Sequence, residues 1–206
     1  GFSGSDREAN AFITTSAEDV FDFDYRSTTG AYVLTTPTTN DSTDFKNGIW
    51  WITRGSTAAS GLDKLLTLAD TSGWRYEGWI IDRANNAAYS TGKFLSPNFA
   101  DLDRAGATAG TEGVDQNSDG RGDGFAFPGQ DFIREQNSVP ARLTLDNGSF
   151  EVRITLEPNP DNVSTPTYLT LLADENIGPN LLSAHAPQAM NNRANLLPSG
   201  TVTINR

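Results

Sequence analysis

The chain contains no cysteine and only one methionine and one histidine. Without cysteine it can form no disulfide, no thiolate metal site and no thiol nucleophile. The single histidine, His185, lies in a loop-like Ser-Ala-His-Ala-Pro stretch without an evident partner residue. A lone histidine of this kind is more often structural or exposed than catalytic. These absences argue against the common cysteine-based and histidine-based chemistries.

Positive charge is scarce as well, because 15 Lys and Arg face 26 Asp and Glu, for a formal net charge of −11. A surface of that sign repels phosphate groups, so we expect no nucleic-acid partner. No apolar run approaches the ~20 residues that cross a bilayer, and we expect no membrane insertion. The abundance of Ser, Thr, Asn and Gly, with few Lys, is typical of exported proteins. We therefore expect an extracellular or cell-surface location.

A side-chain period of two, which is the period of a β-strand, dominates the ordered parts of the sequence. Residues 74–94 form a predicted hairpin around the turn 82–86, with apolar residues on both faces, and we place it in the middle of a sandwich. Residues 142–157 predict a second hairpin around the turn 146–149. Its second arm, 150–157, alternates apolar with polar residues, which predicts one face in the core and one in water.

The whole chain, 1–206, is expected to form one domain, since no linker divides its 206 residues. About ten strands without a helical period predict an all-β, two-sheet antiparallel β-sandwich of the immunoglobulin-like or jelly-roll kind. The pattern stops at 96–137, which predicts one long Gly/Asp-rich loop, and a loop of that length is usually functional, disordered or metal-organised. Residues 1–25 are a candidate N-terminal arm or donor strand.

The long loop contains a candidate calcium site, because oxygen-bearing side chains recur at every second position around Gly120. Calcium prefers six to eight oxygen ligands, and this spacing matches the first part of a calcium loop. The expected ligands are Asp115, Asn117, Asp119, Asp123 and the backbone carbonyl of Arg121. Ala126 stands where an EF-hand has its bidentate Glu, so shorter extracellular calcium-repeat loops are the better comparison. The alternative is a solvated Asp/Gly turn without a metal.

Aromatic residues provide a candidate carbohydrate-binding surface, formed by Trp50, Trp79 and Tyr89. A flat apolar ring suits stacking on a sugar, so a glycan is a possible partner. Trp50 and Trp51 are adjacent and must point to opposite faces of a strand, which predicts that at most one of them is core. The alternative, which base rates favour, is that most of the tryptophans belong to the core.

The N-terminal region carries a candidate assembly strand. Its apolar residues are followed by a strict alternation of aromatic residues with carboxylates, typical of a half-buried strand. The residues concerned are Phe12, Ile13, Phe21, Phe23 and Tyr25. Such a segment could add to the open sheet edge of another copy and build a filament, which makes the chain its own partner. The alternative is that it pairs within its own domain.

Enzymatic function finds little support, since no nucleophile elbow, zinc-protease motif or phosphate loop occurs. A glycosidase needs two carboxylates, for which Glu77 with Glu151 or Glu157 would serve. With 26 acidic residues such pairs always exist, and we interpret these three as solvent-facing sides of strands. The expected function is therefore a non-enzymatic structural or interaction module stabilised by calcium.

Three segments in order, Y-E-G-W-I-I-D, A-A-Y-S-T-G-K-F and F-E-V-R-I-T-L-E-P-N-P-D, form a recognisable strand pattern. It resembles the extracytoplasmic domain of the anti-sigma-K factor family over residues 68–173. The resemblance covers strands and no catalytic residues, and the given sequence shows neither sigma-binding helices nor a transmembrane span. It implies a β-sandwich with an extracytoplasmic location. A sensory domain of an anti-sigma factor is therefore an alternative function.

Overall fold

The computed structural model describes residues 25–36, 43–53, 59–99, 101–102, 127–129, 132, 143–161, 163–167, 169–178 and 186–197. These stretches contain β-strands and short 3-10 helices, and no α-helix is found among them. The strands are β1 (Gly30–Leu34), β2 (Ile49–Trp50), β3 (Trp74–Asp82), β4 (Ala87–Phe94), β5 (Phe150–Pro158), β6 (Thr170–Asp174) and β7 (Gln188–Asn192). The 3-10 helices are η1 (Tyr25–Ser27), η2 (Phe45–Asn47), η3 (Asp70–Ser72), η4 (Leu145–Asn147) and η5 (Ala194–Leu196).

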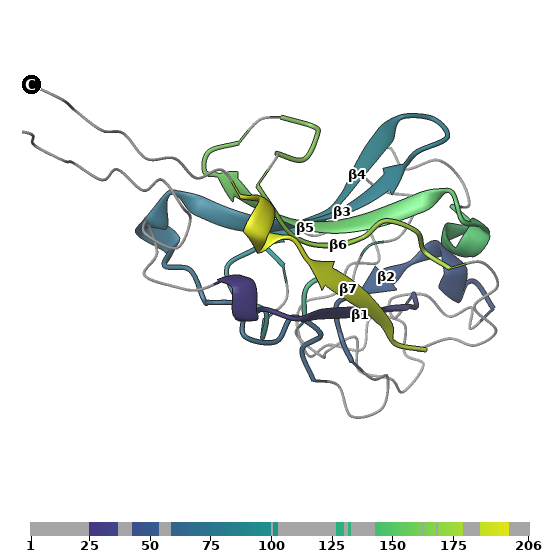
Figure 1. Cartoon of the computed structure of the whole chain (residues 1–206), viewed down its shortest axis with the longest axis horizontal. Coiled ribbons are helices and arrows are strands. Elements are labelled where there is room, and N and C mark those ends of the chain that lie inside the picture. Colours follow the sequence, from purple (N-terminus) through teal and green to yellow (C-terminus); the bar gives the residue numbers. More distant parts are fainter. Residues whose placement is uncertain are drawn as a thin grey trace, which may run out of the picture.

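All seven strands belong to one sheet in the order β2-β1-β7-β6-β5-β3-β4, and every pair is antiparallel. The sheet curls so strongly that it is nearly closed, and β1 and β2 lie below β3 and β5 in Figure 1. The side chain of Trp51, just after β2, donates from Nε1 to Thr91 Oγ1 on β4 at 3.3 Å. This contact brings the two ends of the sheet together across its interior.

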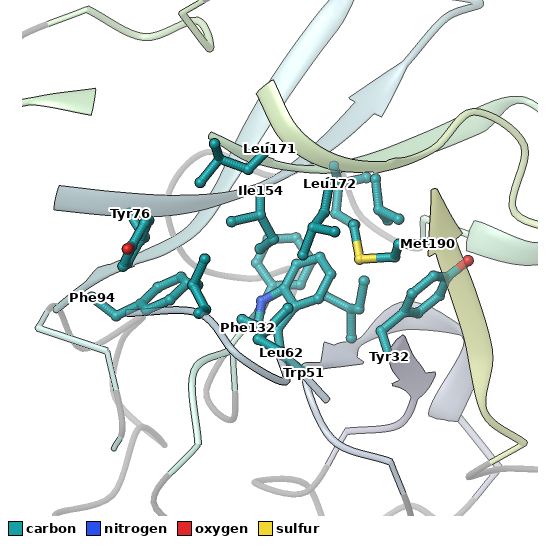
Figure 2. Packing of buried hydrophobic residues seen from close by; sticks show 14 of the residues in the cluster. Tyr32, Trp51, Leu62, Tyr76, Phe94, Phe132, Ile154, Leu171, Leu172 and Met190 are labelled. Atoms are coloured by element: carbon teal, nitrogen blue, oxygen red, sulfur yellow. The ribbon is translucent and has the colours of Figure 1, made fainter. Parts of the chain in front are cut away.

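The main core fills the inside of the curl. Figure 2 shows Tyr32 and Trp51 meeting Ile154 and Leu172 there, although these residues come from opposite sides of the curled sheet. Gly78 on β3 makes room for Trp51, since a Cβ at this position would lie 2.9 Å from the indole nitrogen. The core therefore depends on close approach between one tryptophan and the backbone of β3.

The predicted hairpin at 74–94 is confirmed as β3 and β4, with Asp82 paired to Ala87 beside the turn. Its expected position in the middle of the fold is wrong for β4, which is the last strand of the sheet. The occurrence of apolar residues on both faces of the hairpin has another explanation. Chain segments outside the sheet cover its outer face, so both sides of β3 are buried.

The second predicted hairpin, 142–157, is wrong in its first arm. Residues 143–144 form no strand, and the chain enters η4 directly. The second arm is β5, which pairs with β3 and β6 instead. Leu143 and Leu145 are nevertheless buried in the main core, which explains their apolar character without strand pairing.

The expected all-β antiparallel architecture is confirmed. The described residues account for seven strands in one curled sheet, and a two-sheet sandwich of about ten strands stays a prediction. Within the part of the chain that the structure describes, no helix combines the length and apolar character needed to span a membrane.

Candidate functional site

Most of the residues predicted to bind calcium or to form an assembly strand lie outside the described residues. This holds for Asp115, Asn117, Asp119, Arg121, Asp123, Phe12, Ile13, Phe21 and Phe23. Tyr25 is described and lies fully buried in the core of its own chain. Its hydroxyl is 3.2 Å from that of Tyr76, and its carbonyl accepts from Asn192 Nδ2 at 2.8 Å. Tyr25 is therefore an anchor of the domain.

The structure does not gather Trp50, Trp79 and Tyr89 on one exposed face. Trp50 packs with Val33 and Ile52 in a small second cluster and is 3% exposed. Trp79 is 2% exposed, and Tyr89 is half-buried against the main core on the opposite face of the sheet. Trp50 and Trp51 are both buried, so the expectation that at most one is core was wrong. Glycan binding through these rings stays a prediction, and it would require them to become exposed.

The best-defined group of functional side chains lies on the outer face of β3, β4 and β5. Strand alternation directs Tyr76, Ile80 and Ile154 into the core and the intervening residues outward. The outward residues are mostly polar, and the segment that follows β5 contacts Lys93 and Glu157 among them. The group, which we call the outer-face cluster, consists of Glu77, Trp79, Ser90, Lys93, Thr155, Glu157, Asp161 and Thr167.

Burial is the unexpected property of this cluster. Glu77 is 3% exposed, Glu151 is 6% exposed and Glu157 is fully buried. Their interpretation as solvent-facing sides of strands was therefore wrong. For Glu77 and Glu157 the physical reason is the turn-rich segment after Pro158, which folds back over the sheet, and Asp161 within it has a side chain only 3% exposed.

Glu77 occupies the centre of the outer-face cluster. Ser90 Oγ donates to Glu77 Oε1 at 2.6 Å and fixes the carboxyl group. Glu77 Oε2 is buried and accepts no hydrogen bond, although Lys93 Nζ lies 3.8 Å away. Burial raises the pKa of Glu77 to about 7, against lowering by Ser90 and Lys93, and the charges of Glu157 and Asp161 raise it further. Glu77 can therefore give up or accept a proton near neutral pH.

Lys93 joins β4 to the covering segment. Its ammonium nitrogen lies 3.4 Å from Asp161 Oδ2 and 3.3 Å from the Asp161 carbonyl oxygen. The Lys93 side chain is 29% exposed, whereas the carboxylates that it contacts are almost completely buried. Asp161 Oδ1 accepts from the backbone N–H of Val163 at 2.9 Å. The nitrogen of Lys93 is thus held against one carboxylate that is itself fixed by the backbone.

A chain of hydrogen bonds links the tryptophan of this face to the second buried glutamate. Trp79 Nε1 donates to Thr155 Oγ1 at 3.0 Å, and the Thr155 hydroxyl donates to Glu157 Oε1. The same oxygen accepts from the backbone N–H of Thr167 at 3.0 Å. Glu157 Oε2 is buried without a hydrogen bond. Glu157 therefore ties the covering segment to β5 while keeping one oxygen unsatisfied.

The arrangement suits proton transfer and amine chemistry. Among the described residues no group of three or more His, Asp or Glu is placed to hold a metal ion. A carboxyl group that titrates near neutral pH, beside a lysine and a second carboxylate, is instead a typical acid-base set.

The sequence contained only a weak signal for this cluster. The alternation at 74–82 and 150–157 identified the polar face, and the Pro-Asn-Pro-Asp turn identified the break after β5. Nothing in the local pattern indicates that the chain folds back over that face, because the contact between Lys93 and Asp161 spans 68 residues.

Comparison of the chain with protein-family models, with curated proteins and with solved structures finds no match.

Proposed function

We propose that the chain is a non-enzymatic β-domain of the cell surface that acts as a structural or interaction module and associates with copies of itself by strand addition. One observation carries this proposal. β4 ends the sheet, and no strand among the described residues pairs with its outer edge. The backbone groups along such an edge are a template for another strand. β4 has eight residues; the carbonyl of Lys93 near its end already accepts from Leu102, and the stretch before Lys93 is long enough for that pairing.

Exposed apolar side chains lie next to this edge. Phe99 and Leu102 are 59% and 57% exposed. The backbone N–H of Leu102 donates to the Lys93 carbonyl at 2.6 Å, which places Leu102 against the end of β4. Large apolar side chains beside an open strand favour a protein partner over water.

The N-terminal segment of a second copy is the occupant that the sequence favours. Residues 1–24 precede Tyr25, which is buried in its own domain, so the donor segment ends before that residue. Within it Phe21 and Phe23 alternate with Asp22 and Asp24, which gives a strand one apolar face.

The burial of the acidic residues supports a non-enzymatic role. Glu77 and Glu157, the pair that a glycosidase could use, lie beneath the segment after β5 and have almost no contact with solvent. A polymeric substrate would have to displace that segment to reach them. The module is thus better suited to a structural role than to catalysis on a polymeric substrate.

We also propose that further strands complete a two-sheet sandwich, and that the loop at 115–123 binds calcium. A ligand that binds only the native state must raise its stability. We expect a chelator to lower the melting temperature and added calcium to restore it. Asp119→Asn should remove this response, whereas an unchanged melting temperature in chelator would contradict the calcium site.

The self-association proposal is tested by removing the donor segment while keeping the anchor. A chain without residues 1–23 retains Tyr25 and should be a folded monomer in sedimentation velocity, whereas the full chain should form larger, fibre-like particles in electron micrographs. Phe21→Ser with Phe23→Ser should do the same in the full chain. The matched control is Asp22→Ser with Asp24→Ser, which changes the opposite face of the segment.

The acceptor edge is tested independently. Phe99→Lys with Leu102→Lys places charge beside β4 without touching the core and should reduce association. A full chain that remains monomeric at all concentrations, or variants that assemble like the parent, would contradict the proposal.

A further inference from the structure

Lys93, Asp161 and Glu77 form a compact set that the proposed strand addition does not use. Lys93 Nζ lies 3.4 Å from Asp161 Oδ2 and 3.8 Å from Glu77 Oε2. Both carboxylates are almost completely buried; Glu77 belongs to β3, and Asp161 lies in the segment after β5. The geometry points to an intramolecular amide bond between the side chains of Lys93 and Asp161, formed with Glu77 as the catalytic acid and base.

The reaction is a condensation that balances without a further reactant. Lys93 Nζ attacks Cγ of Asp161, so that a carbon–nitrogen bond forms and the bond from Cγ to Oδ2 breaks. The ammonium nitrogen gives up two protons, which leave with Oδ2 as one water molecule, and the amide nitrogen keeps the third. No electron is gained or lost overall, so no oxidant or reductant is required.

Glu77 has the properties that this proton transfer needs. Its Oε1 is held by Ser90 Oγ, which leaves Oε2 without a hydrogen bond on the side of the Lys93 nitrogen. Because burial, with contributions from Glu157 and Asp161, raises the pKa of Glu77 to about 7, the group can accept a proton from Lys93 and return it to the departing oxygen.

Asp161 is prepared for attack on its other side. The backbone N–H of Val163 donates to Oδ1 at 2.9 Å. When the nitrogen adds to Cγ, negative charge collects on the oxygen that stays, and a fixed backbone donor stabilises that charge. The Asp161 carbonyl, which is 3.3 Å from Lys93 Nζ, helps to hold the nitrogen in place.

The bond would connect β4 to the segment after β5 across 68 residues of sequence. A link over such a separation restricts the unfolded chain in the way that a disulfide does. In a protein without cysteine, an amide bond supplies a covalent link that a reducing environment does not break. The inference stands independently of self-association, since the reacting groups belong to one chain.

The structure also supplies a matched control. Lys46 Nζ lies only 2.6 Å from Asp146 Oδ2, closer than the pair at the proposed bond, and Asp146 is equally buried. No described contact places a glutamate at the Lys46 nitrogen. If proximity were sufficient, this second pair would react first. If the acid-base group is required, only Lys93 should be linked.

The experiment is intact-mass spectrometry of the purified full chain under denaturing conditions, followed by tryptic digestion. We expect a mass below the sequence mass by one water molecule, and a branched peptide that joins Lys93 to Asp161 and is not cleaved at Lys93. Cyclic imides of Asp also lose water, so the sample is treated with hydroxylamine, which opens imides and leaves the amide intact.

Three variants assign the roles, and a fourth, at Lys46, is the control. Lys93→Arg and Asp161→Ala should restore the full sequence mass, and Glu77→Gln should do so although both reacting groups remain. Lys46→Arg should keep the loss of water. A parent chain with the full mass after incubation at neutral pH overturns the inference. A linked Glu77→Gln variant, or a link at Lys46, overturns the role of Glu77.

Discussion

The two faces of β3 and β5 are both buried but differ in composition. The inner face carries Tyr76, Ile80 and Ile154 and packs against Trp51 across the curled sheet. The outer face carries Glu77, Thr155 and Glu157 and is sealed by the segment after Pro158. The inner face is stabilised by packing that does not depend on pH. The outer face is held by hydrogen bonds and ion pairs, so its contribution should change with protonation.

Burial on this sheet is therefore not determined by the pattern of apolar residues alone, because polar side chains are buried as well. The polar residues that alternate with the apolar ones are buried as well, because the segment after β5 folds back over them. Such a polar interior is costly unless its groups are paired, and two of its carboxylate oxygens are not hydrogen-bonded. The remaining cost is typical of sites where buried polar groups have a functional role.

The largest expected effect is on the inner face. Ile154→Ala removes fully buried atoms from the main core and should lower the free energy of unfolding by about 3–4 kcal/mol. Because no titrating group is involved, the loss should be the same at about pH 5 and pH 8. Urea unfolding at the two pH values measures it. A strongly pH-dependent loss of unfolding free energy in Ile154→Ala would contradict the claim that the inner face contributes independently of pH.

The next effect is on the outer face and concerns pH. Since the pKa of Glu77 is raised from 4.5 to about 7 in the fold, its protonated form is the one that the fold favours. The contribution of protonated Glu77 to the free energy of unfolding is fully present below about pH 4.5 and is lost as pH rises through 7. Glu77→Gln should therefore gain about 2–3 kcal/mol over the parent at pH 8 and little at pH 4.5.

This pH effect is best measured in a Lys93→Arg background, which keeps the positive charge and cannot form an amide bond. Urea unfolding is followed from acid to mildly alkaline pH in the chains with Glu77 and with Gln. If the free energy of unfolding varies with pH in the same way in both chains, Glu77 has an ordinary pKa and the outer face is not shielded from solvent.

The smallest expected effect compares one threonine hydroxyl on each face. Thr155→Val takes the acceptor from Trp79 and a donor from Glu157, and should cost about 1–2 kcal/mol. Thr91→Val takes only the long 3.3 Å bond from Trp51 and should cost less, about 0.5 kcal/mol. Thermal unfolding of the two variants side by side checks this order. Equal losses would mean that the outer face is no more dependent on polar contacts than the inner one.

The sequence was sufficient for the elements whose partners are close along the chain. The period-two pattern and the turn at 82–86 correctly predicted β3 and β4, and the apolar positions of β5 correctly predicted its core-facing side. It failed where partners are distant. Residues 143–145 are apolar because Leu143 and Leu145 fill the core, and local pattern cannot distinguish that from a strand.

The outer-face cluster could be predicted only in part. Glu77 and Glu157 were predicted to lie on the solvent-facing sides of their strands, and their burial depends on Asp161 and Thr167, which no local rule connects to them. Trp50 and Trp51 show the same limit. Trp50 is buried beside Phe127, whose carbonyl accepts its indole N–H across 77 residues, whereas Trp51 fills the inside of the curled sheet.

The central claim is that Glu77 is a sealed carboxylic acid on the outer face of the sheet, and infrared spectroscopy tests it most directly. At about pH 6 a carboxyl group with a raised pKa keeps its protonated C=O band after ordinary carboxylates have ionised. We predict such a band in the parent chain, its disappearance as pH rises through 7, and its absence in Glu77→Gln. A parent chain whose carboxyl groups have all ionised by about pH 5.5, or a band that persists in Glu77→Gln, would contradict the claim.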